Sequence, residues 1–206
     1  MSVRRLAVVS AGLSEPSSTR LLADRLADAT TRSLRERGVE ASVEVVELRE
    51  YAHDLANNLL TGFPGPDLQR AVDTVVGADG LVAVTPIFTA SYSGLFKTFF
   101  DVLESESLAG KPVLAAATGG TPRHSLALEH AVRPMFAYLR SVVVPTAVYA
   151  ASEDWGSGSG GDSRSLTDRI NRAADELAGL IVQRPPGDAE GTSDEVTPFE
   201  QLLAGG

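Results

Sequence analysis

Residues 81–103, LVAVTPIFTASYSGLFKTFFDVL, decide the fold of this chain. They open on an apolar run, Leu81–Val84, with the length and composition of a buried parallel strand. Pro86 is expected to stop that strand, and a helix with a bulky apolar stripe is expected over Tyr92–Leu103. A strand, a hydroxyl-rich loop and an amphipathic helix in this order predict a parallel sheet covered by helices.

The same alternation of short apolar runs and helical segments extends along the chain in both directions. Val43–Leu48 alternates apolar residues with glutamates, so this strand is placed near an edge of the sheet. The stretch around Asn57 and Asn58 and through Gly62–Pro66 is expected to be a loop. One five-stranded parallel sheet covered on both faces accounts for this pattern. The predicted strands are Leu6–Val9, Val43–Leu48, Leu81–Val84, Pro112–Ala117 and Val142–Tyr149. The predicted helices are Ser17–Arg37, Asp67–Val76, Tyr92–Leu103, Ser125–Leu139 and Ser165–Val182.

No boundary divides residues 1–184, which are expected to form one domain. Residues 156–163, GSGSGGDS, have the composition of a flexible loop. Residues 185–206 are expected to form an acidic linker and a short helix, because Thr197–Glu200 is a capping box with proline at the first helical position. So short a helix needs a surface to dock on, either the body or a neighbouring subunit. Its expected anchors are Phe199, Leu202 and Leu203.

Composition excludes several classes of protein. The 206 residues carry a formal net charge of −9, and residues 151–206 hold 4 Lys and Arg against 11 Asp and Glu, so most of the charge lies after residue 150. This balance argues against nucleic-acid and anionic-membrane binding. The absence of cysteine excludes disulfide scaffolds, thiolate metal sites and cysteine nucleophiles. The first apolar run is too short for a signal peptide or membrane span, which favours a cytoplasmic protein.

The first of three functional loops is Ser10–Thr19, which carries several hydroxyls and opens into a helix. A helix start offers free N–H groups and a positive dipole end, so this loop suits a phosphate. Ordinary capping by Ser17 or Ser18 explains the same residues. The loop matches neither the G-x-x-x-x-G-K-[ST] nor the G-x-G-x-x-G phosphate motif, and the chain has no G-x-S-x-G nucleophile elbow.

The second and third loops also follow predicted strands, at the edge of the sheet where ligands bind in open parallel folds. Apolar Ile87 and Phe88 in the second loop suit one face of a flat ring. The third loop, Thr118–His124, has two glycines whose backbone can approach a ligand and offer N–H donors. His124 is either a general acid or a structural or surface donor. The histidines lack metal-ligand spacing, so no metal site is predicted.

Together the three loops resemble the motifs of the flavodoxin-like NAD(P)H-dependent FMN reductases. Ser17-Ser-Thr-Arg20 resembles the S-x-[NST]-R phosphate loop of that family. Thr85-Pro-Ile-Phe-Thr-Ala-Ser91 with the following Ser93-Gly-Leu-Phe-Lys-Thr98 and Asp101 resembles its T-P-x-Y-x-x-S-x-x-G-x-L-K-x-x-x-D segment, and Thr118-Gly-Gly-Thr121 resembles its T-G-G-[ST] loop. The similarity covers about residues 3–150. It is closest to the FMN reductases that supply reduced flavin to luciferase-like monooxygenases.

The resemblance implies a three-layer α/β/α sandwich whose five-stranded parallel sheet has the order 2-1-3-4-5. It also implies FMN as the flavin and NAD(P)H as co-substrate, with no preference between NADH and NADPH. Hydride transfer to a flavin is the chemistry of the cofactor, so no catalytic side chain is named. The residues implied to hold the FMN phosphate are Ser10, Ser17, Ser18 and Thr19. Those implied to line the isoalloxazine and ribityl chain are Pro86, Ile87, Phe88, Thr89, Ala90 and Ser91, and those at the pyrimidine end are Thr118, Gly119 and Gly120.

The chain departs from the family pattern at two places. Many relatives have an arginine in the first loop where this chain has Leu13 or nearby polar residues, and a tyrosine where it has Phe88. Neutral donors alone are therefore expected to hold the phosphate, which favours FMN as an exchanging substrate. Two other functions stay open: a quinone, azo or metal-ion reductase that retains FMN, and an electron carrier like flavodoxin, whose acidity this chain shares.

Association of the chain with itself is also expected. The aromatic stripe of Tyr92–Leu103 is wider than one helix face usually needs, although plain core packing explains it equally well. The resemblance to dimeric and tetrameric relatives favours a homodimer or homotetramer whose flavin site lies near a subunit boundary. The residues that suggest this interface are Phe96, Phe99, Phe100, Leu103, Met135, Phe136 and Tyr138.

Overall fold

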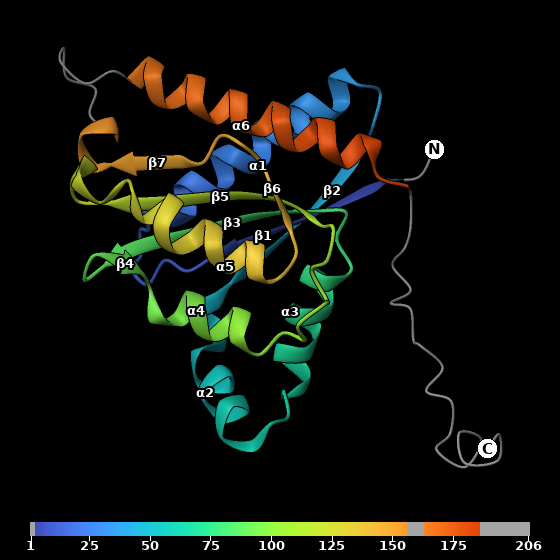
Figure 1. Cartoon of the computed structure of the whole chain (residues 1–206), viewed down its shortest axis with the longest axis vertical. Coiled ribbons are helices and arrows are strands. Elements are labelled where there is room, and N and C mark those ends of the chain that lie inside the picture. Colours follow the sequence, from blue (N-terminus) through green and yellow to red (C-terminus); the bar gives the residue numbers. More distant parts are fainter. Residues whose placement is uncertain (1–2, 156–162, 186–206) are drawn as a thin grey trace, which may run out of the picture.

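A computed structural model describes residues 3–155 and 163–185, which form a sheet between two layers of helices. Helices α1 and α6 cover one face, and α2 to α5 lie on the other side (Figure 1). The predicted docking helix, the linker after Pro185 and the Gly-Ser loop before Ser163 lie outside the described residues. The strands are β1 (Arg4–Ser10), β2 (Ala41–Glu47), β3 (Gly80–Phe88), β4 (Ser91–Tyr92), β5 (Pro112–Gly119), β6 (Val142–Val143) and β7 (Val148–Ala151). The α-helices are α1 (Ser18–Glu36), α2 (Ala52–Thr61), α3 (Pro66–Val76), α4 (Gly94–Asp101), α5 (Arg133–Tyr138) and α6 (Ser163–Gln183).

The sheet has the order β2-β1-β3-β5-β6, with β7 also paired to β5 and the short β4 paired to β3. This is the flavodoxin-like order 2-1-3-4-5 when β6 and β7 are taken as two parts of the predicted fifth strand. The fold class and the edge position of β2 are confirmed, but the sheet has seven strands and not five. The fifth strand is broken around Pro145, where Arg133 donates to the carbonyls of Val144 and Pro145 at 3.0 Å in place of ladder pairing.

Strand β3 does not stop at Pro86, as the sequence predicts, but continues to Phe88. Its pairing with β1 ends at Val84, whereas its pairing with β5 continues through Pro86. A residue without an N–H is tolerated there because the strand has a neighbour on one side only. Strand β3 then turns back antiparallel into β4, so the second loop is a tight hairpin.

The structure corrects the loop predicted around Asn57 and Asn58 and the start of the helix predicted over Tyr92–Leu103. Asn57 and Asn58 lie inside α2 and not in a loop, and Gly62 in the left-handed region ends that helix. Helix α4 begins at Gly94 because the Ser93 hydroxyl accepts a hydrogen bond from the Phe96 N–H at 3.2 Å, which leaves Tyr92 in β4.

The predicted helix over residues 125–139 is divided. A 3₁₀ turn (Pro122–His124) and a π-helical segment (Leu128–Val132) precede α5. Pro134 lies in the first turn of α5 and has no N–H to donate to the preceding turn. A wider turn before a proline is a common result of that missing bond.

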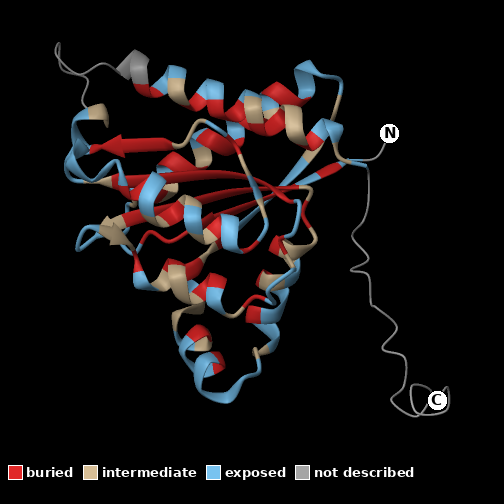
Figure 2. Ribbon diagram, in the orientation of Figure 1, coloured by how far each residue is buried: buried red, intermediate tan, exposed pale blue. Residues whose placement is uncertain are grey.

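The core consists of two apolar layers, one on each face of the sheet, and the central strands are buried on both faces (Figure 2). The aromatic stripe of α4 belongs to this core: Phe96 and Phe99 are fully buried, and the ring centroid of Phe100 lies 4.9 Å from that of Phe136. These aromatic side chains are therefore buried in the core and are not available to a subunit interface. Within the described residues, no helix is both long and apolar enough to cross a membrane.

Candidate functional site

The three predicted loops meet at the carboxyl edge of the sheet and enclose a cleft of about 380 Å³. Adjacent parallel strands β1, β3 and β5 end together there, which is where open α/β sheets bind ligands. The structure thus brings together nine of the predicted binding residues: Ser17, Ser18, Thr19, Pro86, Ile87, Phe88, Thr118, Gly119 and Gly120.

The first loop presents the start of α1 to the cleft. The Ser17 hydroxyl caps this helix by accepting a hydrogen bond from the Arg20 N–H at 3.2 Å, and its own proton stays available to a ligand. Gly12 allows this arrangement, because a Cβ at that position would collide with the Ser17 hydroxyl. The first turn of α1 has no acidic residue, so its positive dipole end is not neutralised within the helix. This end of the cleft suits an anion.

Arg20, the basic residue of the first motif, does not line the cleft. Its guanidinium pairs with Asp24 at 2.8 Å and with Glu47 at the end of β2. The hydrogen bond to Asp24, with the nearby Glu47, raises the pKa of Arg20. Arg20 therefore anchors α1 to β2, and its charge is satisfied by carboxylates of the chain itself.

A buried hydroxyl pair joins the first loop to the third. Thr19 Oγ1 and Thr118 Oγ1 are 2.8 Å apart, and both side chains are almost completely buried. The Thr19 hydroxyl is thus already used within the protein. Its N–H, in the first turn of α1, remains the group with which Thr19 can serve an anion.

The second loop supplies an apolar wall. Thr85 fixes its base, since the Thr85 hydroxyl accepts from the Ser93 N–H at 3.0 Å and donates to the Pro86 carbonyl at 2.9 Å. Phe88 is 48% exposed at the side of the cleft. The predicted residues Thr89, Ala90 and Ser91 form the hairpin beyond the wall and do not line the cleft, and neither does Ser10, which is buried at the end of β1.

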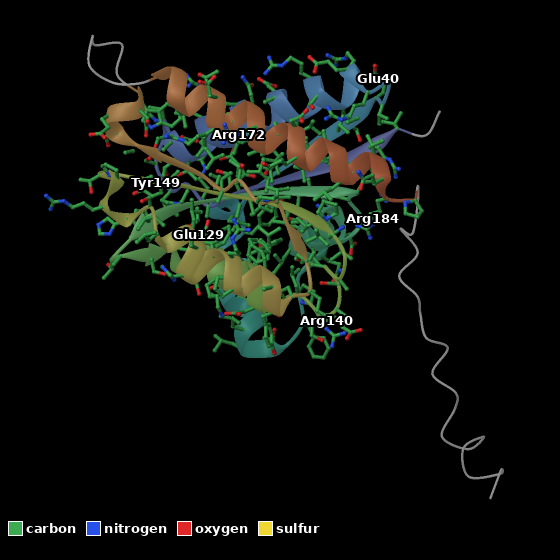
Figure 3. The ribbon with its side chains drawn as sticks, turned by 45° about the horizontal axis from the view of Figure 1, so that its top comes forward. Glu40, Glu129, Arg140, Tyr149, Arg172 and Arg184 are labelled. Carbon is green, nitrogen blue, oxygen red and sulfur yellow. The ribbon has the colours of Figure 1, made fainter. Side chains whose placement is uncertain are left out.

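Tyr149 of β7 supports the third loop through a hydrogen bond. The Tyr149 hydroxyl donates to the Thr121 carbonyl at 2.8 Å, and a Cβ on Gly119 would collide with that hydroxyl. Burial, and then the charge of Asp154, raises the pKa of Tyr149, so the phenol stays a protonated donor. Tyr149 lies toward the opposite end of the molecule from Arg184 (Figure 3). His124 is exposed and does not line the cleft.

Four lining residues are absent from the predicted set: Leu13, Ser14, Ser152 and Trp155. The last two belong to a 3₁₀ turn (Ser152–Trp155) that directly follows β7. The same principle that identified the first three loops points to this turn, because β7 is parallel to β5 and ends at the same edge. A single tryptophan after a predicted strand was the signal available in the sequence.

No acidic or basic side chain is among the described residues that line the cleft. Within residues 3–155 and 163–185, no three acidic or histidine side chains gather in a group that could hold a metal ion. The cleft therefore offers hydroxyls and backbone N–H groups at one end and the Ile87 and Phe88 wall at the side. These groups fit a ligand with an anionic end and a flat ring, such as a flavin mononucleotide.

Known proteins are similar to this chain in sequence and in fold. The model of the family described as NADPH-dependent FMN reductase matches residues 4–156. The NADH-dependent FMN reductase SfnF of Pseudomonas putida is 38% identical over 152 residues, which cover 74% of this chain and 80% of that protein. An FMN reductase (NADPH) of Pseudomonas aeruginosa is 35% identical over 86% of this chain and 92% of its own. The crystal structure of an oxidoreductase from Corynebacterium diphtheriae has a TM-score of 0.85 and 48% identity, and covers 90% of this chain and 100% of that one.

Proposed function

The chain belongs to the NADPH-dependent FMN reductase family, and from this premise we propose that it uses FMN as an exchanging substrate and delivers reduced flavin to a flavin-dependent monooxygenase. The chain is an NAD(P)H:FMN oxidoreductase with a flavodoxin-like fold. The observation that carries the proposal is the neutral phosphate end of the cleft. The described lining contains no cation there, and Arg20 is held by Asp24 and Glu47.

The side chains of the cleft have separate tasks in this proposal. Ser17 and Ser18, with the N–H groups at the start of α1, bind the phosphate through neutral donors and the helix dipole. Ile87 and Phe88 provide the apolar surface for the ring, and exclude water from one side of it. Thr118–Gly120 bring backbone N–H donors to the pyrimidine end, where they stabilise negative charge.

The flavin, when bound, supplies the acceptor for hydride from reduced nicotinamide. The protein therefore needs to align two rings and needs no acid or base side chain at the cleft. The absence of titratable groups among the described lining residues agrees with this division of work. Because the third loop rests on Tyr149, its N–H donors are oriented before the ligand arrives.

Binding and kinetics together test whether FMN exchanges. We expect equilibrium dialysis to show FMN leaving and re-entering the protein, and the rate of NADH or NADPH oxidation to saturate with added FMN. Full activity toward a quinone with only stoichiometric retained FMN would contradict the proposal and support a quinone reductase instead. Riboflavin and FAD, assayed in parallel, show how much of the binding depends on the phosphate.

We further propose that the chain forms a homodimer or homotetramer with the cleft near a subunit boundary. A second groove of about 630 Å³ lies between α4 and α5, and Tyr138 beside it is 81% exposed. Tyr92 lines this groove and pairs with Ile87, which lines the cleft, so the hairpin of β3 and β4 belongs to both. Sedimentation velocity at micromolar concentration is expected to show an oligomer that Tyr138→Asp dissociates, and a monomeric wild type would refute this.

We place the protein in the cytoplasm, where NAD(P)H is regenerated and where a chain without cysteine needs no oxidising compartment. Residues 1–184 are proposed as the reductase domain, and residues 185–206 as an acidic linker with a short docking helix. Fractionation of cells that express the full chain tests the first statement. Removal of residues 186–206 tests the second, because the shortened chain should keep its FMN reductase activity.

A further inference from the structure

We propose that Trp155 closes the phosphate end of the cleft and makes this chain select flavin mononucleotides over flavin dinucleotides. The inference rests on the proposed function, since it takes the start of α1 as the site of the flavin phosphate. It concerns a residue that the family motifs of the first three loops do not include.

The turn that carries Trp155 is fixed on both sides. The Asp154 carboxylate accepts from the Ala151 N–H at 2.7 Å, which ties the turn to the end of β7. The other oxygen of Asp154 accepts from Arg169 of α6 at 3.2 Å. The ring of Trp155 packs half-buried against the core layer beneath α1 and α6. The indole therefore forms a firmly held part of the cleft wall.

Helix α1 locates this wall relative to the phosphate site. The guanidinium carbon of Arg25 lies 5.0 Å from the centre of the Trp155 ring, a cation–π distance. Arg25 follows Ser18 by seven residues, so the two share one face of α1, two turns apart. Trp155 therefore lies along the face of α1 that leads up to Ser18, and both residues line the cleft.

The two flavins differ at this end. The phosphate of FMN is terminal, whereas that of FAD continues through a second phosphate into an adenosine. A flavin phosphate at the start of α1 shares the cleft with Trp155, whose ring lies two turns further along the same face of the helix. An adenosine half that continues past the phosphate along this face would meet the indole. The cleft volume of about 380 Å³ is near the lower end of the range for small-molecule sites, which leaves little other room.

The test compares dissociation constants of FMN, riboflavin and FAD, measured by quenching of flavin fluorescence and by equilibrium dialysis. In wild type, FMN is also expected to quench the emission of Trp155, the single tryptophan of the chain. Trp155→Ala should tighten FAD binding about tenfold while FMN binding changes by less than about threefold, the size of effect that a change of pocket volume gives. Trp155→Phe should give a smaller gain for FAD, and it decides the question if the alanine variant does not fold.

Arg25→Gln is a second, independent test of the proposal. Loss of the cation releases the indole from α1, so this variant should also bind FAD more tightly. Arg32→Gln is the matched control: Arg32 lies seven residues further along α1 and bonds to Asn171, outside the cleft. If wild type binds no flavin, the proposed function fails. If FMN binds but the FAD-to-FMN ratio is the same in all variants, only this inference is wrong. Weaker FAD binding in Trp155→Ala would also overturn it, since the indole would then stack on the adenine.

Discussion

The buried hydroxyl pair of Thr19 and Thr118 allows a quantitative test of how the cleft is assembled. Each hydroxyl has the other as its partner at 2.8 Å, and the two residues are 3% and 4% exposed. Thr19→Val or Thr118→Val alone leaves one buried hydroxyl without this partner. That situation costs about 1–3 kcal/mol of stability.

The double variant should behave differently from the sum of the two. With both hydroxyls replaced by methyl groups of similar volume, no polar group is left unpaired, and the net cost is expected to approach zero. With about 2 kcal/mol for each single variant and almost none for the double, the coupling energy of the double-mutant cycle is about 4 kcal/mol. In urea this corresponds to a midpoint shift of roughly 0.7–1 M for each single variant, and little shift for the double.

Thr30→Val provides the control for this cycle. Thr30 is also buried on α1, but its hydroxyl donates to the Leu26 carbonyl of the same helix. Its substitution should cost less than about 1.5 kcal/mol and should be additive with Thr118→Val. The reasoning is refuted if the Thr19 and Thr118 substitutions are also additive, because the first and third loops would then not depend on each other through this pair.

Three further outcomes follow from the structure. Ala90 has φ of 68°, which strains a residue with a Cβ. Ala90→Gly should relieve this strain and raise the free energy of unfolding, measured in urea, by up to about 1 kcal/mol. A loss of stability would contradict the turn geometry. Burial lowers the pKa of Lys111 to about 8 from 10.5, so between these pH values the unfolded chain binds more protons than the folded chain. The free energy of unfolding should therefore rise by about 3 kcal/mol as the pH increases across this window. The rise should be absent in Lys111→Met. Tyr149→Phe removes the hydroxyl that holds the third loop and should weaken FMN and riboflavin binding equally, whereas Ser18→Ala should weaken FMN binding alone.

The parts of this structure that were predictable are those encoded locally. Continuous apolar runs such as Leu81–Val84 identify buried strands because both faces of a parallel strand are covered. Hydroxyls before an amphipathic segment identify Ser17 or Ser18 as the cap, because few other residues satisfy the free N–H groups of a helix start, and the structure shows that the cap is Ser17. The rule that ligands bind at carboxyl ends of parallel strands then placed three loops at one site.

The parts that were not predictable depend on partners far away in the sequence. Whether Pro86 ends β3 depends on where β1 stops, and the sequence of β3 carries no such information. The division of the fifth strand depends on Arg133, whose bonds to the carbonyls around Pro145 replace those of a ladder. The aromatic stripe of α4 looked too wide for one helix face, because the contribution of Phe136 from α5 to the same layer was not visible locally.

A cleft built from neutral donors has a consequence for how such a site selects its ligand. A cation at the phosphate would attract both flavins, and FMN more strongly, because a terminal phosphate monoester carries about −1.5 to −2 charge whereas the corresponding phosphate of FAD has only one ionisable oxygen. Here the described lining offers no such charge, and the adenosine half, in which the two flavins differ, is the part that the proposal places against the indole of Trp155. In the proposed function, binding through neutral donors favours exchange of the flavin, and in the proposed role of Trp155 the indole limits which flavin exchanges. Both proposals together predict that selectivity and turnover depend on different residues of one cleft, so that each can be changed without the other.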